Sequence, residues 1–111
     1  MAQLRFSELS APRQAFIRRC QRLGFGTIRS LEVRDCEPVL GPKTEVLLDL
    51  KLNAEEELRA EQDLGDFVVP SEILRLLSRL DSIRDGNVEE IEVRAGVPRR
   101  MVFKAADPMH R

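Results

Sequence analysis

The chain has 111 residues, of which 42% are hydrophobic and 33% are charged, and its 18 basic and 19 acidic residues leave a net charge of −1. A chain of this length has material for one hydrophobic core, so we expect a single domain over residues 1–111. No apolar run approaches the roughly 18 residues of a membrane span, and residues 1–14 lack the apolar stretch of a secretory signal. We therefore expect a cytoplasmic protein without a membrane partner.

Residues that carry chemistry are few in this sequence. The only histidine is His110, and Cys20 and Cys36 have no partner at CxxC spacing, so the sequence predicts neither a zinc site nor a disulfide. Phosphate-binding glycine motifs are absent, and no histidine is placed for a catalytic relay. We expect a non-enzymatic protein with no metal and no cofactor.

The first predicted element is a helix that begins after Ser10, a residue type that caps helices, and ends at Gly24. Its apolar residues recur at three- and four-residue spacing, which indicates one buried face: Phe16, Ile17, Cys20 and Leu23. A free cysteine on such a face behaves as a small hydrophobic residue. We therefore expect Cys20 in the core.

A strand with apolar Ile28, Leu31 and Val33 follows, and its step of three residues predicts an inserted residue or a late start of the strand. Asp35 and Cys36 are predicted to form a hairpin turn. The acids beside Cys36 disfavour a reactive thiolate, so we interpret it as a turn residue. The return strand starts at Val39 and Leu40 and is interrupted by Gly41 and Pro42. A longer strand then runs through alternating apolar residues, which predicts one buried face: Val46, Leu48, Leu50 and Leu52.

Residues 54–66 hold six acids against Arg59, a local charge of −5. Asn53 is a suitable cap for a short helix that ends at Gly65, but only Leu58 and Leu64 offer apolar surface. A short helix and a flexible linker are therefore both open for this segment. Phe67 and the two valines after it are candidates for a short strand.

The second half repeats the first after a shift of 60 residues. The segment LEVRDCEP at 31–38 falls on IEVRAGVP at 91–98, and the match extends back over about 28 residues in all. A helix opened by Pro70 and Ser71 ends before Asp85 and Gly86. A strand, a turn at Ala95 and Gly96, and a return strand again follow it. Two similar units can share such punctuation by chance, but we favour duplication of one structural unit.

These elements predict an α+β fold, a two-layer sandwich built from a tandem helix–hairpin (αββ-αββ) internal repeat, with both helices on one face of an antiparallel sheet. We expect a first unit at 7–52, an acidic linker or short helix at 53–67, a second unit at 68–105 and a flexible tail at 106–111.

Two functional hypotheses follow. The first is a protein-interaction or self-associating module, forming a homodimer through the edge strand that carries Val46, Leu48, Leu50 and Leu52, with a further protein partner open. The alternative is a nucleic-acid-binding regulator that uses a basic stripe on the first helix. The stripe consists of Arg13, Arg18, Arg19 and Arg22. The net charge of −1 favours the first hypothesis.

Overall fold

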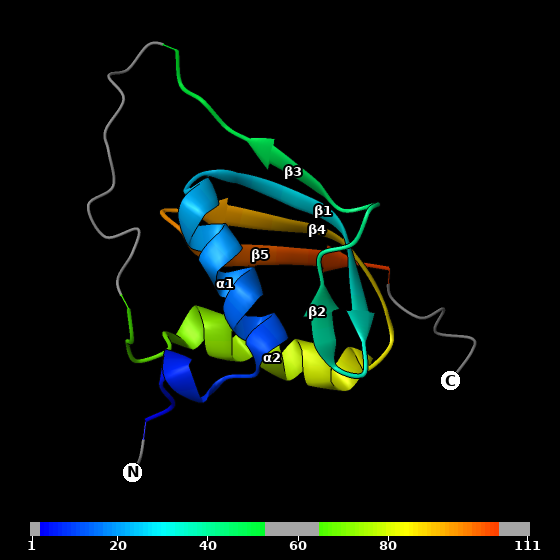
Figure 1. Ribbon diagram of the computed structural model, residues 1–111. Coiled ribbons are helices and arrows are strands. Elements are labelled where there is room, and N and C mark those ends of the chain that lie inside the picture. The colour runs from blue at the N-terminus through cyan, green and yellow to red at the C-terminus, as the bar shows by residue number, and fades with distance from the viewer. Residues whose placement is uncertain (1–2, 53–64, 105–111) are drawn as a thin grey trace.

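The computed structural model describes residues 3–52 and 65–104, and it shows an α+β fold with two helices and an antiparallel sheet of five strands (Figure 1). In chain order the elements are a 3-10 turn η1 (Phe6–Glu8), α1 (Ala11–Leu23), β1 (Gly26–Arg34), β2 (Glu37–Val39), β3 (Glu45–Leu48), α2 (Ser71–Ile83), β4 (Gly86–Arg94) and β5 (Val97–Phe103).

Both helices begin and end where their sequences predict. The hydroxyl of Ser10 caps α1 by accepting a hydrogen bond from the Arg13 amide, and Gly24 ends the helix with a φ of 75°. Pro70 precedes α2, and Arg84 ends that helix with a φ of 66°. The two boundaries predicted for each helix are therefore confirmed.

The sheet has the strand order β2-β1-β4-β5, and β3 pairs with the first half of β1. The long central strands run antiparallel, with Gly26 opposite Val93 and Val33 opposite Gly86. Both helices lie across one face of this sheet, as Figure 1 shows. The opposite face presents charged side chains to solvent, among them the pairs Arg94–Glu92 and Arg100–Glu90.

The core lies between the helices and the two central strands. The apolar residues predicted on these strands are all at most 1% exposed: Ile28, Leu31, Val33, Val88, Ile91 and Val93. Their step of three is accommodated by an irregularity, because Ser30 has a φ of 59° and the β4–β5 register shifts between Val88 and Glu90. The predicted break in alternation is confirmed.

The two hairpin turns also lie where the sequence predicts them. Asp35 and Cys36 have φ values of 54° and 67°, and Ala95 and Gly96 have 53° and 78°. Two consecutive left-handed residues match the twist of the flanking strands and are typical of a tight two-residue hairpin.

The predicted long return strand through Val46, Leu48, Leu50 and Leu52, with one buried face, is wrong. Only Glu45–Leu48 form a strand, and every residue of it is exposed. A turn before β3 carries the chain away from β2, fixed by the Thr44 hydroxyl, which bonds to the amide of Gly41 and the carbonyl of Ser30 at 3.1 Å each. The chain then returns along the sheet edge, where neither helix covers it.

Equivalent elements of the two halves are 60 residues apart. The helices begin at Ala11 and Ser71, and the central strands begin at Gly26 and Gly86. Two hydrogen bonds that link the halves are related in the same way: the Cys36 amide donates to the Arg84 carbonyl, and the Gly96 amide donates to the Gly24 carbonyl, both at 2.8 Å. The acidic segment and the tail, apart from residues 65–67, lie outside the described residues.

Candidate functional site

Arg13, the first arginine of the predicted stripe, lies where α1, α2 and the first hairpin turn meet. Its guanidinium group donates hydrogen bonds to the Glu37 carboxylate at 3.1 Å, the Cys36 carbonyl at 2.9 Å and the Asp81 carboxylate at 2.6 Å. Only 17% of the side chain is exposed. Arg13 therefore joins the two halves of the chain, and two carboxylates face its charge.

Arg18 holds the N-terminal segment against residues 65–67. Its guanidinium carbon lies 4.1 Å from the centre of the Phe6 ring, and its group donates a hydrogen bond to the Gly65 carbonyl at 2.6 Å. Phe6 stacks on Phe67 with ring centres 5.0 Å apart, and its amide donates to the Phe67 carbonyl. A cation over an aromatic face is attracted by the ring, so Arg18 is engaged inside the chain.

Asp66 completes this N-terminal contact. Its carboxylate accepts hydrogen bonds from the Arg5 side chain at 2.8 Å and from the Ser7 amide at 2.9 Å. The hydrogen bond from Arg5, followed by that from the Ser7 amide, lowers the pKa of Asp66 from 3.8 to about 2. Asp66, one acid of the predicted acidic segment, therefore holds Arg5 and Ser7 near the N-terminus through hydrogen bonds.

Arg19 and Arg22 are exposed on α1 and make no ion pair or hydrogen bond within residues 3–52 and 65–104. The structure therefore leaves two of the four predicted nucleic-acid contacts free. Arg13 and Arg18 make hydrogen bonds to other residues of the chain. The spacing of the four arginines in the sequence does not show which of them have such partners.

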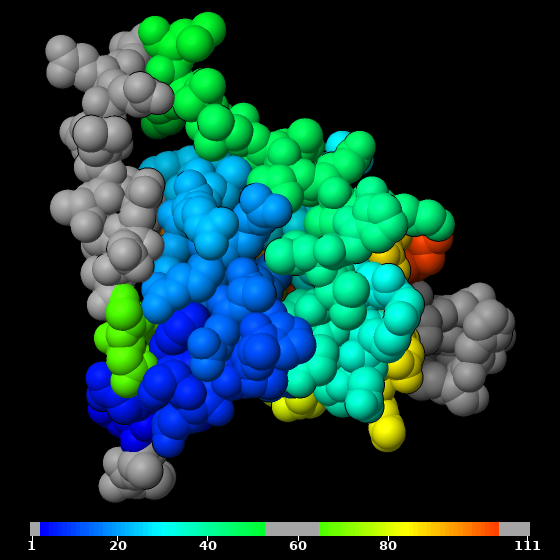
Figure 2. All heavy atoms as spheres, in the orientation of Figure 1, coloured from blue at the N-terminus to red at the C-terminus, as the bar shows by residue number. Residues whose placement is uncertain are grey.

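Three of the four residues predicted for self-association lie on an apolar edge, a name we use for Phe25, Val46, Leu47, Leu48 and Leu50. They are 37–59% exposed, and Leu52 beyond them is 95% exposed. Phe25 lies beside the end of β3, since its carbonyl accepts a hydrogen bond from the amide of Asp49, the residue after the strand, at 2.9 Å. Figure 2 shows residues 45–52 in green along one edge of the molecule.

β3 carries apolar side chains on both faces. Val46 lies opposite Ile28 in the register, and Leu48 lies on the same face opposite Gly26. Leu47 lies on the other face opposite Thr27, two residues from Glu45. Within the described part of the chain β3 pairs only with β1, so its outer backbone groups have no strand partner. An exposed apolar edge strand is a surface that pairs readily with another chain.

Gly26 allows β3 to approach β1 closely. A Cβ atom at this position would lie 2.1 Å from the Leu47 carbonyl oxygen and 2.9 Å from a methyl group of Leu23. At the equivalent Gly86 the nearest atom is a methyl group of Ile83 at 3.2 Å. A glycine at 26 is therefore required by the apolar edge.

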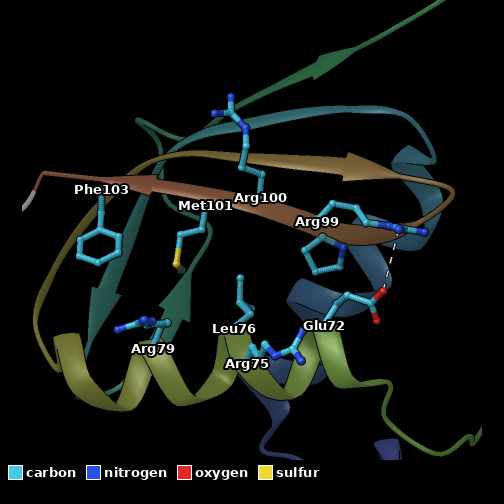
Figure 3. Close-up of a pocket in the computed structure, with 9 residues that line it drawn as sticks. Glu72, Arg75, Leu76, Arg79, Arg99, Arg100, Met101 and Phe103 are labelled. Atoms are coloured by element: carbon cyan, nitrogen blue, oxygen red, sulfur yellow. Dashed lines mark ion pairs between the residues drawn. The ribbon is translucent and has the colours of Figure 1, made fainter.

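A second surface, which sequence analysis missed, is a groove of about 360 Å³ between α2 and β5. Its apolar floor contains Leu76 from the helix and Met101 and Phe103 from the strand, and both strand side chains point toward α2 (Figure 3). Arg75 and Arg79 line it from the helix. We call this surface the arginine groove.

Charges in the arginine groove are only partly neutralised. Arg99 lies 3.9 Å from Glu72, a long and exposed pair (Figure 3). Arg75 and Arg79 are exposed and have no ion-pair partner among the described residues. The signal available in the sequence was the spacing of Arg75 and Arg79, which puts them on one side of a helix, but the groove itself depends on β5.

The two cysteines are free and differ in burial. Cys20 is buried on α1 as predicted, and burial raises the pKa of its thiol to about 12. Cys36 is partly exposed, and its Sγ lies 3.7 Å from the Asp81 carbonyl. Over residues 3–52 and 65–104, no group of three or more metal-ligating side chains is placed to hold an ion, and neither helix is long and apolar enough to span a membrane.

The chain was compared with protein families, curated proteins and solved structures. No family model, curated protein or solved structure matches the chain.

Proposed function

We propose that the protein is a non-enzymatic interaction module that forms a homodimer through the apolar edge. The observation that supports this most strongly is β3, a strand with exposed apolar side chains on both faces and an unpaired outer edge. Two copies of β3 related by a two-fold axis pair antiparallel, which satisfies the backbone groups of both edges and removes Leu47 and Leu48 from water. The free cysteines are in keeping with a reducing compartment, and we place the module in the cytoplasm.

Light scattering on the protein at micromolar concentration tests the dimer. We expect about 25 kDa for the wild type, twice the 12.7 kDa of one chain. In Leu48→Lys a charge lies in the proposed interface, so we expect the mass of one chain with an unchanged circular dichroism spectrum, because Leu48 is 59% exposed. Leu74→Lys, at an exposed leucine on α2, is the matched control and stays dimeric. A monomeric wild type overturns the proposal.

We also propose that residues 7–52 and 68–105 arose by duplication of one helix–hairpin unit. The 60-residue spacing of the helices, the central strands and the two hydrogen bonds between the halves supports this. A crystal structure in which residues 11–40 do not superpose on residues 71–100, because the two segments adopt different secondary structures, would contradict it.

The alternative function, nucleic-acid binding, is favoured by the unpaired Arg19 and Arg22. It requires an affinity for duplex DNA or RNA that falls steeply with salt, since each neutralised phosphate releases counterions. Replacing Arg19 and Arg22 by Gln would then flatten the log–log salt slope by about two units. Binding with that change in slope would replace the interaction module as our conclusion.

A further inference from the structure

The arginine groove lies at the edge of the sheet opposite the apolar edge, because β5 ends the strand order at one side and β2 and β3 end it at the other. Its floor is apolar, and its helical wall carries Arg75 and Arg79 one turn apart. Like charges at this spacing repel each other on a helix, so a negatively charged group between them relieves the repulsion. The groove therefore suits a ligand that combines carboxylates with apolar side chains.

The outer edge of β5 adds backbone recognition to this surface. Among the described residues β5 pairs only with β4, so its other edge offers N–H and C=O groups to a further strand. Pro98 has no N–H to donate, which confines such pairing to Arg99–Phe103. A strand added there would place alternate side chains in the groove beneath α2.

Part of the groove's charge is specific to this half of the chain. At the positions 60 residues earlier, Arg75, Arg99 and Arg100 correspond to Ala15, Val39 and Leu40, whereas Arg79 corresponds to Arg19. Arg75 is therefore not a requirement of the helix, since α1 forms with alanine at the corresponding position.

We propose that the arginine groove binds an extended acidic segment of a partner protein, which adds to β5 as a strand. Its carboxylates contact Arg75 and Arg79, and its apolar side chains cover Leu76 and Met101. A peptide fits better than a nucleic acid because the outer edge of β5 can pair with a peptide backbone, and Leu76 and Met101 can be covered by apolar side chains.

Fluorescence polarisation with the labelled peptide EEVDVEED tests this proposal on the full chain. We expect saturable binding that weakens with salt, and a loss of at least tenfold in affinity for Arg75→Gln/Arg79→Gln. The matched control is Arg19→Gln/Arg22→Gln on α1, which has the same charge change and keeps wild-type affinity. A peptide methylated at alternate backbone nitrogens also loses at least tenfold, because it cannot pair with β5, whereas a purely electrostatic contact would tolerate methylation.

The proposal is overturned by equal binding of the peptide to the groove variant and its control, by tighter binding of single-stranded RNA than of the peptide, or by no effect of backbone methylation. A tenfold gain in affinity when Glu55, Glu56 and Glu57 are replaced by Gln would also overturn it, because the chain's own acidic segment would then be the occupant. The assay is repeated on Leu48→Lys, so that failure of the groove and failure of the dimer are distinguished.

Discussion

Arg13 connects the two halves of the fold, and Arg13→Met removes its charge while keeping most of the aliphatic stem. A hydrogen bond to a charged group makes a net contribution to stability of about 1.5–3 kcal/mol, and an exposed ion pair contributes about 0.2–1 kcal/mol. The Cys36 carbonyl belongs to the first kind, Asp81 is 62% exposed and belongs to the second, and Glu37, 32% exposed, lies between them. We expect a loss of about 3 kcal/mol.

Thermal and urea denaturation measure this loss. For a chain of this length about 3 kcal/mol corresponds to a decrease in Tm of about 10–13 °C. Arg19→Met, on the same helix and without a partner in the described residues, is the matched control and changes stability by less than about 0.5 kcal/mol. A double-mutant cycle with Glu37→Gln gives a coupling of about 1 kcal/mol. If the free energy of unfolding of Arg13→Met lies within 0.5 kcal/mol of the wild-type value, the role assigned to Arg13 is refuted.

Three further outcomes are expected. Gly26→Ala displaces β3, so hydrogen exchange of its amides accelerates, whereas Gly86→Ala leaves the sheet protected; equal protection in both would contradict the close-approach argument. An aromatic disulfide reagent at pH 8 modifies Cys36 and spares Cys20 until the protein unfolds, because Cys20 is buried and its pKa is about 12. The ionised Asp66 carboxylate stabilises the N-terminal contact above pH 3.8, because its pKa is lowered in the folded chain, and this stabilisation is lost as the pH falls toward about 2. Asp66→Asn removes that pH dependence, which is measured as the rate of proteolysis near Arg5.

The core could be predicted from sequence because its information is local. The spacing of apolar residues in α1 and β1, and the turn residues Asp35 and Cys36, specify helix, strand and hairpin within a few residues of themselves. The partners of Arg13 are 24 and 68 residues away, and the arginine groove needs α2 and β5 together. The alternation in Val46–Leu52 predicted a buried face that only a covering helix would have provided.

The two halves keep apolar residues where they share the core and differ in charge on exposed helix surface. Ile28 and Val88 both fill that core, where a charged side chain has no place, whereas Ala15 and Arg75 lie on exposed helix surface, where many side chains are tolerated. An exposed leucine on β3 or an unpaired Arg75 has no role in that core. Such residues are free to serve binding, which is why the two edges of one sheet carry different chemistry.

The placement of these edges makes a joint prediction. A dimer formed through β3 presents one arginine groove at each outer end, because β5 lies at the opposite edge of the sheet. A peptide with two acidic segments and a linker long enough to span both grooves therefore binds the dimer more tightly than a single segment does, by a factor of about 10²–10⁴ for a suitable linker. Leu48→Lys abolishes this gain and leaves the affinity for the single segment unchanged. If the tandem peptide keeps its advantage on the monomeric variant, the gain comes from rebinding at one groove and the two surfaces are not coupled in this way.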